Sequence, residues 1–315
     1  MKSKLTMTEC IHSDSYQNDQ GSPNPPLYDT SLFAFESTQA MRDVMEGKAP
    51  GAFYSRYGMN PTITALEGKL AQLDNAEASL AFSSGMAAIS ALFMHFATRG
   101  ILCVGDVYGG TQQLLSKQLP ALGINTFSLQ KTDLKAVETS LKADKPALVF
   151  IETPSNPTLQ LQDIKRLAKL VHEYDALLVV DNTFATPVNQ CPIVLGADFT
   201  VQSATKYLGG HSDLTAGVLS GRVGQLEAIN DWRKNLGQTI STEVAHKLSR
   251  SLLTLALRVE RHNFNAQLIA DYLDTHSKVR KTCYPGLKGH PHHDFIHQQM
   301  SGFGGMVSFY IEGDS

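Results

Sequence analysis

Lys206 lies in a stretch of residue types that could perform chemistry, between Phe199 and Gly217. The stretch begins as a short half-buried β pattern and continues with hydroxyl side chains, one lysine, two glycines and a histidine. A lysine flanked by Ser203 and Thr205 at a strand exit can be held inward while the hydroxyls supply hydrogen bonds. This arrangement suits a lysine that forms a Schiff base beside a phosphate. The alternative is a surface lysine on a polar loop, the common place for a lysine.

Residues elsewhere in the chain match the other needs of such a lysine. A pyridoxal phosphate site requires an amine, a carboxylate that keeps the pyridine nitrogen protonated, an aromatic side chain over the ring, and donors for the phosphate. Asp181 can supply the carboxylate, and Tyr108 can stack on the ring. Alone, either residue could be a helix cap or a core side chain; together they favour a cofactor site. The phosphate donors expected are Gly85, Met86, Ser203, Thr205 and Arg56.

Other kinds of site find little support in the sequence. No G-x-G-x-x-G follows a predicted strand, which weakens a dinucleotide-binding interpretation. The pairs Gly47-Lys48 and Gly68-Lys69 are followed by Ala and Leu, which excludes a P-loop, and a G-x-S-x-G elbow is absent. Four histidines between 290 and 297 could suggest zinc. They lack the spacing of known zinc motifs, so we favour a solvated connector and predict no metal.

Apolar strands alternate with amphipathic helices through the middle of the chain. This order is typical of a mostly parallel α/β sheet with helices on both faces. Such sheets bind ligands at the carboxyl ends of their strands, which is where Glu152, Asp181, Ser203 and Lys206 cluster. The predicted strands are 78–82, 147–151, 176–180 and 199–203, and the helices include 84–96, 133–141 and 164–171.

The two ends of the chain differ from this pattern. Prolines at 21–26 predict an extended arm, with a disordered tail as the alternative. The segment 242–276 has a helical pattern, and 306–311 resembles a strand with no evident partner, a poor place for a domain to end. We therefore predict three parts: an N-terminal arm over 1–60, a pyridoxal phosphate-binding domain over 61–255, and over 256–315 a C-terminal α+β domain that is truncated.

Composition narrows the classes of protein. The chain has 315 residues, of which 42% are hydrophobic and 18% charged, and its net charge is −3. This is ordinary globular composition without the basic footprint of a nucleic-acid or anionic-membrane binder. The N-terminus lacks the apolar core of a signal peptide, and no apolar run reaches membrane-spanning length. Four scattered cysteines predict reduced thiols and a cytoplasmic location.

The motifs around the site residues resemble the Cys/Met-metabolism family of pyridoxal phosphate enzymes of fold type I. That family includes cystathionine γ-lyase, cystathionine γ-synthase and methionine γ-lyase. The resemblance covers about Tyr54 to Phe309, most of the chain. Its motifs, in order, are Tyr54-Ser-Arg56 with Asn60-Pro-Thr62, Ser84-Gly-Met-Ala-Ala88, Tyr108-Gly-Gly-Thr111, Glu152-Thr-Pro-Ser-Asn-Pro157, Asp181-Asn-Thr183, Ser203-Ala-Thr-Lys-Tyr-Leu208 and Gln299-Met-Ser-Gly-Phe-Gly-Gly305.

The resemblance implies a role for each site residue. Lys206 would carry the cofactor and remove the substrate α-proton, and Asp181 would pair with the ring nitrogen. Tyr108 would stack on the ring and assist proton transfer, with Asn156 bonded to the phenolic oxygen of the cofactor. Gly85, Met86, Ser203 and Thr205 would hold the phosphate. Tyr54 and Arg56 would reach the phosphate of a neighbouring subunit, in a homotetramer built from catalytic dimers.

The implied activity is that of a carbon–sulfur lyase of transsulfuration, acting by γ-elimination on cystathionine or methionine. A γ-replacement transferase of the cystathionine γ-synthase or homoserine sulfhydrylase type is the alternative, and an inactive cofactor-binding protein with a structural or regulatory role is a third. The sequence departs from the family where substrate is recognised. No arginine can be assigned to the substrate carboxylate, Gln112-Gln113 follows Thr111, and 237–246 lacks the usual proline- and arginine-rich pattern.

Overall fold

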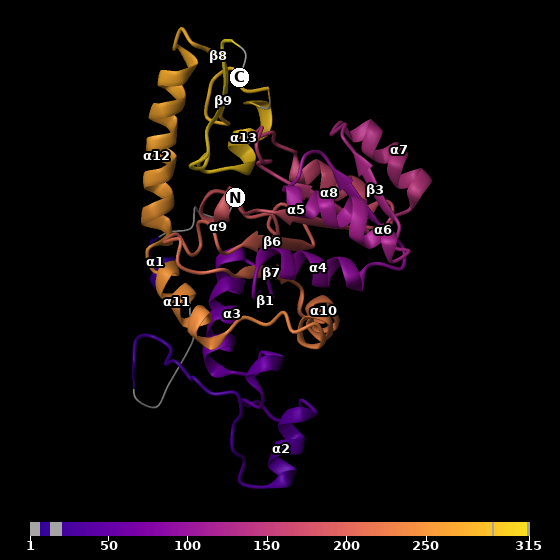
Figure 1. Cartoon of the computed structure of the whole chain (residues 1–315), viewed down its shortest axis with the longest axis vertical. Coiled ribbons are helices and arrows are strands. Elements are labelled where there is room, and N and C mark those ends of the chain that lie inside the picture. Colours follow the sequence, from indigo (N-terminus) through magenta and orange to yellow (C-terminus); the bar gives the residue numbers. More distant parts are fainter. Residues whose placement is uncertain (1–6, 13–20, 292, 314–315) are drawn as a thin grey trace.

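A seven-stranded sheet forms the centre of the molecule (Figure 1). The computed structural model describes residues 7–12, 21–291 and 293–313; parts of the expected arm (1–6 and 13–20), His292 and residues 314–315 lie outside. In spatial order the strands are β1 (Ala78–Phe82), β7 (Gly217–Gly221), β6 (Phe199–Ser203), β5 (Leu177–Asp181), β4 (Leu148–Glu152), β2 (Ile101–Val104) and β3 (Thr126–Leu129).

All strands of this sheet except β7 run in the same direction. The pairs β2–β3, β2–β4, β4–β5 and β5–β6 are parallel, whereas β7 is antiparallel to both β1 and β6. The register sets Glu152 beside Asp181 at the carboxyl ends of β4 and β5. The mostly parallel α/β sheet predicted from the sequence is therefore confirmed.

Helices cover both faces of the sheet, as predicted. On one face, α4 (Gly85–His95) and α10 (Val223–Asn235) pack against alternate strand residues such as Phe82, Phe150 and Phe199. On the other face, α3 (Pro61–Asp74) and α11 (Thr242–Leu252) pack near β1 and β7, and α7 (Leu134–Asp144) and α8 (Ile164–His172) near β2, β4 and β5. Other short helices are α1 (Met7–His12), α5 (Gly109–Gln113), η2 (Leu114–Gln118), α6 (Leu119–Ala121) and α9 (Thr186–Asn189).

Side-chain caps fix where the predicted helices begin. Ser84, Asp133, Asp163 and Ser241 each accept a backbone N–H in the first turn of α4, α7, α8 and α11. The helical pattern over 242–276 corresponds to two helices, because α11 ends at Leu252 and α12 (Leu255–Asp274) begins after a two-residue turn. Amides 253 and 254 bond carbonyls three residues back, which tightens the turn between the helices.

The last part of the chain forms a small sheet beside α12. Strand β9 (Ser308–Ile311) pairs antiparallel with β8 (Val279–Cys283), and α13 (His293–Gln299) lies between them in sequence. The expectation of a strand without a partner is therefore wrong. The partner segment, Val-Arg-Lys-Thr-Cys, has no alternating apolar pattern that could have revealed it. Within the described ranges, no helix is long and apolar enough to cross a membrane.

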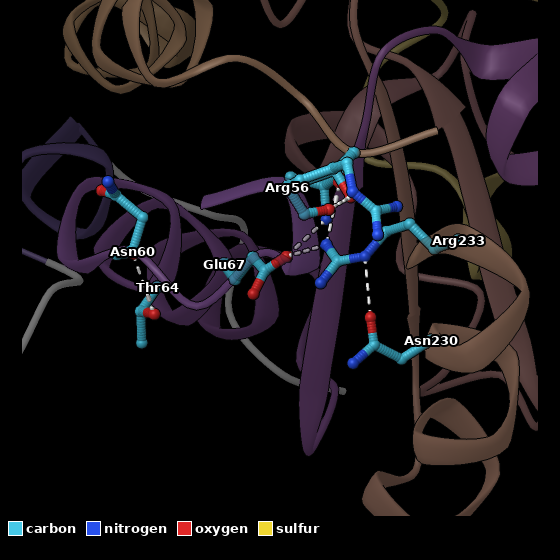
Figure 2. Close-up of polar contacts among 8 residues, drawn as sticks. Arg56, Asn60, Thr64, Glu67, Asn230 and Arg233 are labelled. Atoms are coloured by element: carbon cyan, nitrogen blue, oxygen red, sulfur yellow. Dashed lines mark hydrogen bonds and ion pairs between the residues drawn. The ribbon is translucent and has the colours of Figure 1, made fainter. Parts of the chain in front are cut away.

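Within the described arm, the segment around α2 (Thr38–Met45) extends away from the sheet (Figure 1), whereas α1 packs against the body with Cys10 buried. The arm returns to the body through the short 3₁₀ helix η1 (Ser55–Tyr57). Arg56 in η1 donates a hydrogen bond to the Lys234 carbonyl in α10, at 2.6 Å. Next to it, Arg233 of α10 points between α3 and β1 and forms an ion pair with Glu67 (Figure 2).

Candidate functional site

A pocket of about 460 Å³ opens at the carboxyl ends of the central strands and the N-terminus of α4. Of the ten site residues predicted from the sequence, eight line it, although they come from segments more than 100 residues apart. They are Gly85, Met86, Tyr108, Asn156, Asp181, Ser203, Thr205 and Lys206. The topology explains this convergence, because parallel strands deliver their carboxyl ends to the same edge.

Lys206 lies in the loop that follows β6, with its side chain exposed to the pocket. The loop is held by its own backbone: the Lys206 N–H donates to the Ser203 carbonyl at 3.1 Å, and the Gly210 N–H donates to the Lys206 carbonyl at 2.7 Å. Arg258 of α12 secures the loop from outside by donating to the Tyr207 carbonyl at 2.6 Å. The amine is thus placed by a fixed backbone and has room to meet a ligand.

Asp181 ends β5 and is 7% exposed. Its Oδ1 accepts two hydrogen bonds from Thr183, one from the backbone N–H at 3.0 Å and one from the hydroxyl at 2.6 Å. Burial raises the pKa of Asp181, whereas the bonds from Thr183 lower it. A buried carboxylate of this kind is suited to pairing with a cation that enters the pocket.

Glu152 is a second buried acid of the pocket, and the prediction from sequence gave it no role. It ends β4 beside Asp181 in the register. Its two carboxyl oxygens accept the N–H groups of Tyr108, at 2.7 Å, and Asn156, at 2.9 Å. Burial, and then the negative charge of Asp181, raise the pKa of Glu152. Because the charges of Glu152 and Asp181 repel each other, a state in which only one of the two carboxyl groups is ionised is favoured.

The N-terminus of α4 forms the end of the pocket that is suited to an anion. The first amides of a helix have no intrahelical acceptor, and in α4 the third is bonded by the Ser84 hydroxyl at 3.1 Å. This leaves the N–H groups of Gly85 and Met86, both in the pocket lining. Opposite them lies Ser203, so close that a Cβ on Gly85 would lie 2.9 Å from the Ser203 Cβ.

The two hydroxyls expected at this end differ in their bonding. Thr205 Oγ1 accepts the Ala216 N–H at 3.1 Å and donates to the Ala216 carbonyl at 3.3 Å. For the Ser203 hydroxyl, no partner exists among the described residues, so it remains available to a ligand. The arrangement provides amide and hydroxyl donors suited to a phosphate.

Tyr54 and Arg56 do not join the pocket. Besides its bond to α10, the Arg56 guanidinium lies 5.4 Å from the Tyr54 ring centre and 4.7 Å from that of Tyr57. The Arg56 carbonyl accepts the Thr239 hydroxyl at 2.7 Å. The pair is thus fixed elsewhere on this subunit, and its contact with a neighbouring subunit stays a prediction.

Several lining residues were not singled out from the sequence. Thr183 is the last residue of the Asp181-Asn-Thr183 motif. A threonine two residues after an aspartate can donate a hydrogen bond to that carboxylate, and this spacing could have indicated its role. Thr215, Phe184 and Met306 carry no comparable local signal. In the part of the chain that the structure describes, the pocket has no arginine in its lining, and no three potential metal ligands converge. His292, one of the four histidines considered for zinc, lies outside that part.

Sequence comparison places this geometry among known proteins. A model of the Cys/Met metabolism PLP-dependent enzymes matches residues 7–315. Cystathionine gamma-synthase 1, chloroplastic, of Nicotiana tabacum is 40% identical over 291 residues, covering 92% of this chain and 54% of that protein. A cystathionine beta-lyase of Lactococcus lactis subsp. cremoris is 40% identical over 98% of this chain and 79% of its own length. An L-methionine gamma-lyase of Fusobacterium nucleatum is 38% identical, with 99% and 80% covered.

Solved structures agree with these relatives. The metB structure from Corynebacterium glutamicum matches with a TM-score of 0.91 and 38% identity, over 98% of this chain and 78% of that one. A cystathionine gamma-lyase from Lactobacillus plantarum, complexed with L-serine, matches with a TM-score of 0.89 and 36% identity, over 97% and 78%. The chain spans about half the length of the plant relatives, 54% and 52%, and about four fifths of the bacterial ones.

Proposed function

Since this chain belongs to the Cys/Met metabolism family of PLP-dependent enzymes, we propose that it is a carbon–sulfur lyase that acts by γ-elimination on cystathionine or methionine. The observation that supports the cofactor chemistry of this proposal is the convergence of Lys206, Asp181 and Tyr108 in one pocket. A relative named L-methionine gamma-lyase, matched over 99% of this chain, supports γ-elimination, and a relative named cystathionine beta-lyase, matched over 98%, supports a lyase in the broader sense.

The residues of the pocket fit pyridoxal phosphate. The amides of Gly85 and Met86 and the Ser203 hydroxyl lie at one end of the pocket and have no hydrogen-bond acceptor or donor among the residues that the structure describes, and a dianionic phosphate needs such donors. At the other end, the buried carboxyl of Asp181 pairs with no cation of the described residues and would gain one from a protonated pyridine nitrogen. Gly85 leaves space where any larger side chain would meet Ser203.

Each of the eight predicted residues in the pocket lining then has a proposed role. Bound pyridoxal phosphate supplies an electron sink that stabilises negative charge on the substrate α-carbon. The Lys206 amine holds the cofactor and moves a proton at Cα, and Asp181 keeps the ring nitrogen protonated. Tyr108 stacks on the ring and assists proton transfer, and Asn156 bonds the phenolic oxygen. Gly85, Met86, Ser203 and Thr205 hold the phosphate.

The proposed assembly involves the two predicted site residues that lie outside the pocket. Arg56 donates a hydrogen bond to α10 and lies over the Tyr54 ring, and both residues lie outside the pocket of their own subunit. We propose that they serve the phosphate of a neighbouring subunit in a homotetramer of catalytic dimers. The division into an arm over 1–60, a cofactor domain over 61–255 and a partial α+β domain over 256–315 is part of the same proposal.

A γ-replacement transferase is the second candidate. Two relatives of 40% and 38% identity are named cystathionine gamma-synthases. Such an enzyme would use the same cofactor residues and add a thiol acceptor, so the pocket described above does not separate the two activities.

One experiment tests both candidates. The purified protein is incubated with cystathionine, with methionine, and with an activated homoserine ester plus a thiol, and 2-oxobutanoate, free thiol and the replacement product are measured. A lyase releases 2-oxobutanoate from the first two substrates. A transferase forms product only from the ester and the thiol. Bound cofactor without any turnover would overturn both proposals and leave a structural or regulatory role. Lys206→Ala should abolish the visible absorbance of the bound cofactor.

A further inference from the structure

Glu152 joins two loops that carry pocket side chains. Its Oε2 accepts the Tyr108 N–H at 2.7 Å, and its Oε1 accepts the Asn156 N–H at 2.9 Å. Tyr108 follows β2 and Asn156 follows β4, and these two strands are paired in the sheet. One carboxyl group thus connects the exits of neighbouring strands, and it is only 6% exposed.

Burial and neighbouring negative charges make an ionised carboxyl group at position 152 energetically costly, so its presence there needs an explanation. Among the described residues, the charged groups that act on Glu152 are the acids Asp181 and Asp106, which oppose its ionisation. Its compensation comes from the two backbone N–H groups rather than from a cation. A carboxyl group offers an acceptor at each of two atoms, whereas an amide side chain offers one acceptor and one donor. The two loops therefore require a carboxyl group of this length.

We propose that Glu152 is a positioning residue of this site, which holds Tyr108 and Asn156 in register with one another. This inference rests on the proposed function, in which those two side chains contact the cofactor ring. Glu152 acts through their backbones and does not itself touch the substrate. Tyr108 is half exposed. Few packing contacts hold its side chain, so the position of its ring over the cofactor depends on how its backbone is held. Small errors in such placement reduce rates strongly.

Glu152→Gln tests the proposal, because it keeps the volume and turns one acceptor into a donor that faces an N–H. In the cofactor-free protein, hydrogen exchange at Tyr108 or Asn156 should become at least about tenfold faster. In the loaded protein, the circular dichroism of the bound cofactor should fall by about half or more, with cofactor stoichiometry maintained. The kcat should fall about ten- to a hundredfold with little change in KM.

Asp74→Asn is the matched control, because it also removes a buried acid, here at the end of α3 against the sheet, but lies outside the pocket lining. It should leave the exchange of both amides, the dichroism and kcat at wild-type values. If Glu152→Gln does not fold, Glu152→Asp serves instead, since it keeps both oxygens but cannot reach both amides.

The outcomes separate this inference from the proposed function. A wild-type protein that fails to bind pyridoxal phosphate overturns the proposed function. Normal cofactor binding with wild-type exchange, dichroism and kcat in the folded Glu152 variant overturns the role of Glu152 alone. Equal losses of exchange protection, dichroism and kcat in the Asp74→Asn control would also overturn it. The losses would then result from removing any buried acid that packs against the sheet.

Discussion

Arg233 and Glu67 form an ion pair beneath the surface, with side chains 2% and 15% exposed (Figure 2). Arg233 also donates to the Ala81 carbonyl at 2.9 Å, and Glu67 accepts the Ala81 N–H at 2.8 Å. Ala81 lies in β1, one of the two edge strands of this sheet. The ion pair therefore satisfies both backbone groups of an edge residue and ties α10 and α3 together around that edge, which blocks pairing with another chain.

Glu67→Ala should lower stability substantially. Removing one partner leaves the Arg233 charge buried and the Ala81 N–H without an acceptor. Breaking a buried pair in this way costs about 3–5 kcal/mol. Urea denaturation of the cofactor-free protein, followed by circular dichroism at one protein concentration, measures the change. Glu138→Ala breaks the exposed pair with Lys142 and should leave the midpoint unchanged. Equal midpoints for the two variants would contradict the importance of the buried pair.

Gly217→Ala should damage the phosphate end of the pocket. A Cβ at position 217 would overlap the Ser84 carbonyl and lie 2.7 Å from the Gly85 nitrogen. These are backbone atoms at the start of α4, so β7 and the helix must move apart, at about 1–3 kcal/mol. Titration with pyridoxal phosphate should show weaker binding, by roughly tenfold for each 1.4 kcal/mol lost at the site.

Gly68→Ala provides the control for the glycine substitution. Gly68 lies inside α3, and a Cβ there would have no neighbour within 4 Å. Alanine is the better helix former by roughly 0.5–1 kcal/mol, so this variant should be as stable as the wild type or slightly more so. Wild-type cofactor affinity in Gly217→Ala would show that the start of α4 does not hold the phosphate.

Asp74→Asn should flatten the dependence of stability on pH. Asp74 lies beneath the sheet, where it accepts hydrogen bonds from Gln202, at 2.8 Å, and Ser220, at 2.6 Å. Burial raises the pKa of Asp74 from 3.8 to about 7. The folded protein therefore binds this proton more tightly than the unfolded chain, so the stabilisation is complete below about pH 4 and lost as pH rises to about 7.

The measurement compares urea midpoints of both proteins between pH 4 and 8. Asparagine fits the site because the Ser220 hydroxyl can rotate to accept a hydrogen bond. The wild type should lose up to about 1.4 kcal/mol per pH unit more than the variant in this range. Parallel pH profiles would contradict a raised pKa at this position.

The sequence predicted the fold where local pattern and tertiary environment agree. The apolar runs of β4, β5 and β6 are buried on both faces of the sheet, so composition alone identifies them. Strand β7 was missed because its segment, Gly-Val-Leu-Ser-Gly, carries no strand signal of its own. It is a strand because β1 and β6 lie on either side of it and supply its hydrogen bonds. The helix α10, which comes directly after β7 in the chain, was not predicted either.

The sequence could predict those site residues whose positions depend on the order and direction of the strands. Asp181, Ser203 and Lys206 stand at strand ends, so parallel topology alone brings them together. Glu152 was noticed at a strand end, but its task depends on two backbone amides from other loops, which no spacing reveals. Met306 reaches the pocket from a segment 100 residues after Lys206, and only the folded chain shows that contact.

Thr183→Val should reduce activity by acting on Asp181. The Thr183 hydroxyl donates to Asp181 Oδ1 at 2.6 Å and accepts the Ser203 N–H at 2.8 Å. Valine keeps the shape but removes a bond that lowers the pKa of Asp181, so that pKa should rise. Losing a hydrogen bond to a charged group costs about 1.5–3 kcal/mol, which corresponds to roughly a ten- to hundredfold fall in kcat/KM.

The pH profile distinguishes this effect from a simple loss of packing. Asp181 is proposed to act in its ionised form, so a higher pKa requires a higher pH, and the acidic limb of the kcat/KM profile should move to higher pH in Thr183→Val. Thr183→Ser retains the hydroxyl and should keep the limb at the wild-type position, even if it loses some stability. An unshifted acidic limb in the valine variant would mean that Thr183 does not tune the charge of Asp181. A shift of equal size in the serine variant would assign the effect to the lost methyl group.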